Sequence, residues 1–199
     1  MTRVIRALYD DATVTVYQAY SPEIATAALT TGTLVPPFKV DRMTWIKPSF
    51  LWMMYRSGWA TKPGQERVLA IRVKRSGFDW ALRNSCLSAF DPGHHESPEE
   101  WRRQLAESPV RIQWDPDKDL QLSPLHQRAI QIGLGGVAAR KYVAEWIVSI
   151  SDRTELAHSV HAMVKDGRAS EALALLPKER GYRVSAGIGG RIGLNARPT

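Results

Sequence analysis

The stretch from Arg42 to Trp59 holds the residue types best suited to binding a nucleotide. Trp45, Trp52 and Trp59 are interleaved there with basic and hydroxyl side chains. Aromatic rings stack on flat ligands, and arginine or lysine pairs with phosphate. The composition therefore indicates a nucleotide-like ligand. The alternative interpretation is an aromatic-rich core element whose arginines extend their charged ends into water.

Glu145 is the second residue that could do chemistry. We expect it in the middle of an apolar strand over residues 142–150, on the same face as Val143 and Ile147. A buried carboxylate without a partner is costly, so Glu145 requires a basic side chain, a polar cleft or a ligand. The alternative is a structural glutamate in a salt bridge on a half-exposed sheet face.

The elements that position these residues can be read from local signals. Pro48 is compatible with the first turn of a helix but not with its interior. We therefore expect a strand over 43–46, a turn at Lys47-Pro48 and a helix over 49–56, which Gly58 ends. The helix is expected to bury Phe50, Met53 and Met54. Its other face, or the surface beside it, is expected to present Trp52, Tyr55 and Arg56.

Residues 13–20 alternate between polar and apolar types and predict a strand, with Gln18 and Tyr20 on one face and Tyr17 on the other. A helix should follow Ser21-Pro22 and end at Gly32. The other expected strands cover residues 3–9, 67–75, 110–114 and 142–150. The other expected helices cover residues 78–89, 124–134 and 169–176, with one more that begins at about residue 98 and another that ends at about residue 164.

Length and charge limit the class of protein. The chain has 199 residues, of which 44% are hydrophobic and 24% charged, as expected for one globular domain. We predict a single α+β domain over 1–180 and a basic, disordered tail over 181–199. The net charge of +7 favours polyanionic partners. The only cysteine, Cys86, excludes an intramolecular disulfide, and no signal peptide or membrane span is evident, so a cytoplasmic location is expected.

The order of these elements resembles the ADP-ribosyltransferase superfamily, in particular DNA-modifying toxins and RNA 2′-phosphotransferases. The resemblance comes from the strand with Val16–Tyr20, the aromatic-rich element, the strand over 68–73 and the late segment Ala144–Val148. It implies compact mixed or antiparallel sheets flanked by helices, and NAD as a substrate. To about residue 165 the chain also resembles an uncharacterised bacterial and fungal family, most specifically over 43–59.

The resemblance implies a role for individual residues. Gln18 occupies the first-strand position, where His or Arg is usual; glutamine can hydrogen-bond a ribose or a nicotinamide amide but brings no charge. Thr44 and Ser49 are both candidates for the middle motif. Glu145 takes the catalytic position, where a carboxylate stabilises the oxocarbenium character that develops as the nicotinamide–ribose bond breaks.

The remaining NAD contacts stay open between pairs of residues. Tyr20 or Tyr55 is expected to stack on nicotinamide, and Arg56 or Lys47 to pair with the pyrophosphate. No metal is required. The paired histidines His94 and His95 are expected in an exposed polar loop.

The alternative function is a non-catalytic, basic module that binds single-stranded DNA or RNA. Its expected contacts are the aromatic and basic side chains of one stretch: Arg42, Trp45, Trp52, Tyr55 and Arg56. A cleft shared by Gln18, Tyr55 and Glu145 would favour the enzyme. An open basic face with Glu145 elsewhere would favour the module.

Overall fold

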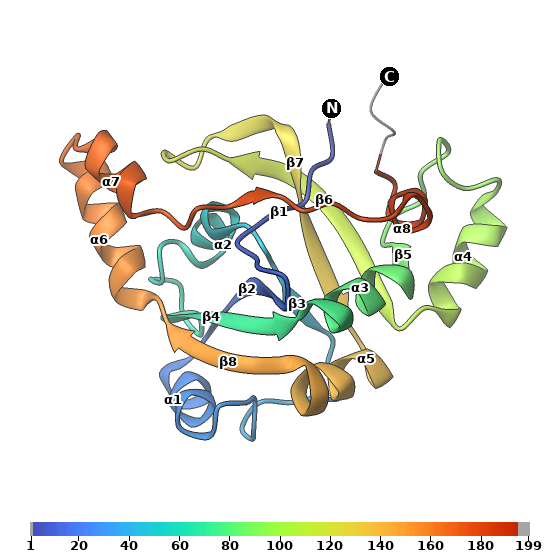
Figure 1. The fold of residues 1–199 in the computed structure, drawn as a ribbon, viewed down its shortest axis with the longest axis horizontal. Helices are drawn as coiled ribbons and strands as arrows, with labels where there is room; N and C mark the ends of the chain where they lie inside the picture. The colour runs from blue at the N-terminus through green and yellow to red at the C-terminus, as the bar shows by residue number, and fades with distance from the viewer. Residues whose placement is uncertain (1, 195–199) are drawn as a thin grey trace.

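Two β-sheets and the helices around them form an α+β fold (Figure 1). The structure is a computed structural model and describes residues 2–194. The first sheet is antiparallel and has the order β2-β4-β8, from strands β2 (Thr13–Tyr20), β4 (Arg67–Lys74) and β8 (Ile147–Asp152). The second has the order β3-β7-β6-β5, from β3 (Thr44–Ile46), β7 (Pro124–Leu134), β6 (Val110–Lys118) and β5 (Ser85–Leu87).

The two sheets meet at a single bridge between Tyr17 of β2 and Lys47, the residue that follows β3. Tyr17 donates its backbone N–H to the carbonyl of Lys47 at 2.7 Å, and Lys47 returns a bond to Tyr17 at 3.2 Å. Gln18, Thr44 and Lys47 are therefore brought to one junction by backbone hydrogen bonds.

A short third sheet joins the two ends of the described chain. Strand β1 (Arg6–Ala7) pairs antiparallel with β9 (Arg180–Gly181), and Figure 1 shows them running side by side in blue and orange-red. The helices surround the sheets and comprise α1 (Pro22–Thr31), α2 (Phe50–Ser57), α3 (Arg75–Arg83), α4 (Pro98–Glu107), α5 (Gly136–Lys141), the π-helical turn η1 (Tyr142–Trp146), α6 (Thr154–Lys165), α7 (Ala169–Leu175) and α8 (Ala186–Arg191).

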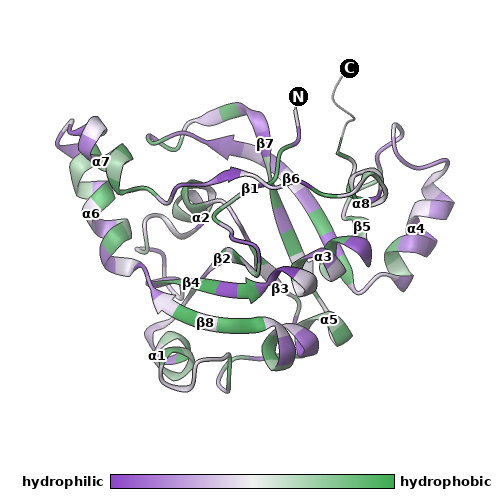
Figure 2. Ribbon diagram, viewed as in Figure 1, coloured by the Kyte–Doolittle hydropathy of each residue, from purple (hydrophilic) through white to green (hydrophobic). Residues whose placement is uncertain are grey.

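The buried hydrophobic residues form two clusters. The larger lies between the two main sheets, and the smaller packs α2 against α6, α7 and β4. Helix α4 lies at the edge of the molecule, has no buried residue, and is largely hydrophilic in Figure 2. No helix within residues 2–194 combines the length and apolar character needed to cross a membrane.

Several sequence predictions are confirmed. The strand over 13–20 is β2, the helix after Ser21-Pro22 ends at Gly32 in a left-handed conformation, and the strand–turn–helix over 43–58 is β3 and α2. Ser49 is the N-cap of α2 and Gly58 its C-cap. The strand over 67–75, the helix from 98 and the helix over 169–176 are also present.

The helix expected over 124–134 is wrong, because these residues form the long strand β7. Ser123-Pro124 looks like a helix start, yet Ile130, Ile132 and Leu134 are apolar at period two and are buried against the core. Pairing with β6 and β3 satisfies the backbone along the strand. Tertiary pairing therefore outweighed the local capping signal.

Three other boundaries differ from the predictions. The strand expected over 142–150 begins only at Ile147, because residues 142–146 form the turn η1. The helix expected over 78–89 is α3 over 75–83, followed by β5. The strand expected over 3–9 is reduced to the two residues of β1.

Residues 181–194 do not form the disordered tail that was expected from residue 181. Tyr182, Ile188 and Ile192 are buried in the main core, and α8 lies among these residues. Three apolar side chains spaced along this segment supply the burial that a disordered tail lacks. Residues 195–199 of the predicted tail lie outside the described part of the chain.

Candidate functional site

Gln18 lies in a buried hydrogen-bond network that joins three distant segments. Its amide nitrogen donates to the hydroxyl of Thr44 at 2.6 Å, and its amide oxygen accepts from the hydroxyl of Tyr142 at 2.8 Å. The hydroxyl of Tyr20 lies 3.2 Å from that of Thr44. Gln18 is only 3% exposed. Strand β2, strand β3 and the turn η1 are therefore held together by neutral polar groups.

The electrostatics of this network keep its phenols protonated. Burial raises the pKa of Tyr142 and of Tyr20 above the ordinary tyrosine range. Tyr142 can therefore act only as a neutral donor to Gln18, which fixes the orientation of the amide. We refer to Gln18, Tyr20, Thr44 and Tyr142 as the Gln18 network.

Lys47 lies beside the Gln18 network and shares an acceptor with it. Its ammonium donates to the carbonyl of Trp45 at 3.1 Å, and the Gln18 amide approaches the same oxygen at 3.4 Å. Burial, with a smaller contribution from Arg56, lowers the pKa of Lys47 to about 7. No carboxylate of residues 2–194 forms an ion pair with it, so Lys47 is poised either to transfer a proton or to become charged beside an anion.

Ser49 has a different environment, at the N-terminus of α2. Its hydroxyl lies 3.3 Å from the carboxylate of Asp117, and Glu179 accepts the backbone N–H of Phe50 at 2.6 Å. Arg6 pairs with both carboxylates, at 3.5 Å to Asp117 and 3.2 Å to Glu179. Ser49 thus belongs to a buried acidic cluster rather than to the Gln18 network.

The sequence interpretation missed both acids of this cluster. The Asp117 side chain is 1% exposed, and burial raises the pKa of Glu179 to about 7. Neither acid lies in an apolar stretch that would mark it as buried. No sequence signal marked Asp117, because the structure extends β6 past the strand expected over 110–114 and places Asp117 at an irregularity between Pro116 and Lys118.

Tyr55 and Arg56 lie on the outer surface of α2. Tyr55 is 45% exposed, and the ammonium of Lys118 lies 3.8 Å from the centre of its ring. Arg56 is exposed beside it. Trp52, which was expected on or beside this face, is instead buried against Lys47, whose ammonium lies 5.9 Å from the indole ring.

Glu145 lies on η1 and not within a strand. Its side chain is 54% exposed and pairs with Lys141 at 3.2 Å, one helical turn earlier. It therefore does not need a buried partner, contrary to the expectation for an acid inside an apolar strand. Tyr142, three residues before it on the same turn, forms the hydrogen bond to Gln18.

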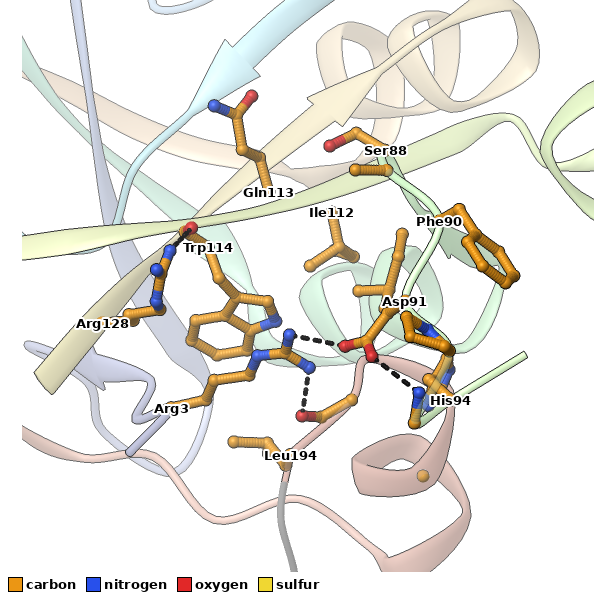
Figure 3. A pocket seen from close by; sticks show the side chains of 16 residues that line it. Arg3, Ser88, Phe90, Asp91, His94, Ile112, Gln113, Trp114, Arg128 and Leu194 are labelled. Carbon is orange, nitrogen blue, oxygen red and sulfur yellow. Dashed lines mark hydrogen bonds and ion pairs between the residues drawn. The ribbon is translucent and has the colours of Figure 1, made fainter. Parts of the chain in front are cut away.

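A hollow of about 760 Å³ lies apart from all the predicted site residues (Figure 3). Arg3 extends into it and pairs with Asp91 at 2.8 Å. His94 also lines it, while the neighbouring His95 is buried rather than exposed as expected. Within residues 2–194 no group of three or more His, Cys, Asp or Glu side chains is placed to hold a metal ion.

The structure therefore brings together half of the expected site. Gln18, Tyr20, Thr44 and Lys47 are neighbours at the junction of the two sheets. Ser49 faces the acidic cluster, Tyr55 and Arg56 face outward, and Glu145 pairs with Lys141. The side chains of Gln18, Tyr55 and Glu145 bond to or contact separate partners. These contacts do not bring the three side chains together in the shared cleft that was expected for the enzyme.

Comparison with known proteins identifies a family. A family model described as "Domain of unknown function (DUF4291)" matches residues 4–182, which is most of the chain. No curated protein matches the chain.

Proposed function

Because the chain belongs to the DUF4291 family, whose description names no activity, we propose a function from the arrangement of the site: an ADP-ribosyltransferase-like enzyme that uses NAD to modify a nucleic acid, nucleotide or protein acceptor. The observation that supports it is the Gln18 network. This network joins the first strand, the middle element and the late segment containing Glu145, the three segments that the sequence resemblance assigns to such a site.

In this proposal the network positions the segments, and the exposed Glu145 and the buried Lys47 contact NAD. Glu145 supplies the carboxylate that stabilises positive charge on the ribose as the bond to nicotinamide breaks. Its pairing with Lys141 is solvent-exposed and worth only about 0.3–0.5 kcal/mol, so the carboxylate is readily released to a substrate. Lys47 pairs with the pyrophosphate, which supplies the counter-charge that this buried lysine lacks.

The test measures NAD binding and NAD cleavage separately. A ligand that binds only the folded state raises the melting temperature by mass action, so millimolar NAD should raise that of the wild type. Glu145→Gln should keep the shift and lose the release of nicotinamide. Glu155→Gln, at an exposed glutamate on α6, is the matched control and should retain both.

Two results would contradict the proposal in different ways. An absent thermal shift would remove NAD as the substrate. Unchanged nicotinamide release in Glu145→Gln would leave the activity but remove Glu145 as its carboxylate. A shift that Lys47→Met abolishes would assign the pyrophosphate to the lysine.

A second candidate function is supported by the outer face of α2. The exposed Tyr55 ring has Lys118 over it and Arg56 beside it, an aromatic and basic surface suited to single-stranded DNA or RNA. Tyr55→Ala and Arg56→Gln should weaken binding to an oligonucleotide and reduce its salt dependence, whereas Arg102→Gln on α4 should not. Binding that is unaffected by these substitutions would exclude this surface.

A further inference from the structure

The face of β2 opposite Gln18 lines a separate hollow of about 440 Å³. Thr15 and Tyr17 lie on this face because successive side chains of a strand point to opposite sides. The hollow extends across the whole β2-β4-β8 sheet and reaches Ser151 and Arg153 at the end of β8. Its size is within the range typical of small-molecule sites.

The strand register arranges the polar groups in rows. Tyr17, Ala70 and Ser151 are paired side by side across the three strands, and Thr15 is paired with Arg72 in the next row. Ala70 is the smallest side chain in its row, so it leaves space between two hydroxyl-bearing neighbours. The sheet therefore forms a floor with hydroxyl groups on both sides of a gap.

Several donors on this floor have no partner in the described residues. Arg72 is fully engaged, since it bonds to Asp10 at 2.7 Å and to Thr13 at 2.9 Å. In contrast, no hydrogen bond to a side-chain group of Thr15, Tyr17, Ser151 or Arg153 is found within residues 2–194. Tyr17 is only 1% exposed, and burial raises the pKa of its phenol, so it remains a neutral donor.

The charge and the walls of the hollow restrict the ligand. Two arginines and one aspartate line it, which gives a net charge of +1. Because Asp10 is paired with Arg72, the positive charge that remains belongs to Arg153. The walls are apolar and include Leu8 and Leu175, both substantially exposed although they are large hydrophobic residues. An anion with an apolar part matches both features.

We propose that this hollow binds a phosphate monoester that has an aromatic or apolar group. The phosphate pairs with the guanidinium of Arg153 and accepts hydrogen bonds from the hydroxyls of Tyr17, Thr15 and Ser151. A phosphate monoester presents three acceptor oxygens, which matches this number of donors better than a carboxylate does. The organic group lies against Leu8, Leu156 and Leu175.

This site is independent of the proposed NAD site, because Gln18 lies on the other face of β2. Calorimetric titration with phenyl phosphate tests it, with inorganic phosphate and phenol as separate probes. Wild type should bind phenyl phosphate more tightly than either fragment. Arg153→Gln should raise the dissociation constant by about 10-fold or more, because it removes the charged hydrogen-bond donor to the phosphate.

Tyr17→Phe keeps the ring and removes only the hydroxyl, so it should raise the dissociation constant by about 3- to 10-fold. Arg102→Gln, an exposed arginine paired with Glu99 on α4, is the control and should bind as wild type. Absent binding of phenyl phosphate, or equal binding by Arg153→Gln, would overturn the proposal. Equal affinity for inorganic phosphate would remove the apolar part of the ligand.

Discussion

The two faces of β2 differ in how their polar groups are used. On one face, Gln18 and Tyr20 bond to Thr44 and Tyr142, and the Gln18 network is closed. On the other face, the hydroxyls of Thr15 and Tyr17 have no hydrogen-bond partner within residues 2–194, although both residues are buried. One strand therefore presents one face whose polar groups bond within the protein and one face whose hydroxyls open into a hollow.

This difference separates two uses of buried polarity. A network in which each member has a partner fixes the relative position of the segments that it joins, because breaking any bond leaves a buried group unpaired. Hydroxyls that line an open hollow without a protein partner can instead bond to water, and a ligand can replace that water. The closed face is thus suited to holding the architecture, and the open face to binding.

The largest effect is expected at the centre of the closed face. Gln18→Ala leaves the hydroxyls of Tyr142 and Thr44 without their partner and creates a cavity, so the free energy of unfolding should fall by about 4 kcal/mol. Urea unfolding measures it. Gln121→Ala, the same change at an exposed turn, should lie within about 0.5 kcal/mol of wild type. A small effect of Gln18→Ala would show that the network does not hold the segments.

Glu179, whose charge contributes to the raised pKa of Tyr17 on the open face, should make stability depend on pH. Its pKa is raised from 4.5 to about 7, so the folded state binds its proton more tightly than the unfolded state. The stabilisation of the folded state by this bound proton is therefore complete below about pH 4.5 and is lost as the pH rises through 7. At 1.36 kcal/mol per pKa unit the loss is about 3 kcal/mol.

Glu179→Gln isolates this contribution, since it keeps an acceptor for the backbone of Phe50 but cannot ionise. The difference in unfolding free energy between wild type and Glu179→Gln should shift in favour of the variant as the pH rises from about 4.5 to 7. A difference that stays constant over this interval would mean that the carboxylate ionises normally in the folded protein.

Two matched substitutions compare the faces directly. Tyr142→Phe removes the donor to Gln18 and should lower the free energy of unfolding by about 1–2 kcal/mol. Thermal and urea unfolding of this variant measure the strength of one bond of the closed face.

Tyr17→Phe makes the same chemical change on the open face and should have the smallest effect, less than about 0.5 kcal/mol, because its hydroxyl has no partner to lose in the described residues. Equal losses in the two variants would show that the faces do not differ.

Local signals in the sequence were sufficient for most elements near the site. Ser49, Pro48 and Gly58 defined α2 to within a residue, and alternation defined β2 and its two faces. The same kind of signal failed at β7, where Ser123-Pro124 predicted a helix and long-range pairing produced a strand. Capping residues act over one turn, whereas the pairing of β7 with β6 depends on the rest of the fold.

The site was predictable only in part for the same reason. Gln18 and Thr44 were selected from what the family resemblance implies, and the structure shows that they bond to each other. Tyr142 was not selected, because its role depends on η1, where the expected strand is absent. Asp117 and Glu179 meet only through Arg6 and α2, and spacing along the chain does not reveal such a contact.

The pairing of β1 with β9 has a consequence for the order in which the protein assembles. Arg6 and Glu179 come from opposite ends of the described chain, so their ion pair cannot form until residue 179 has been synthesised. Until then the N-terminus of α2 lacks the acceptor that Glu179 provides, and Arg6 lacks one of its two carboxylate partners. Closing so long a loop is slow and entropically costly. A growing chain on the ribosome therefore completes this region only after β9 has emerged and paired with β1.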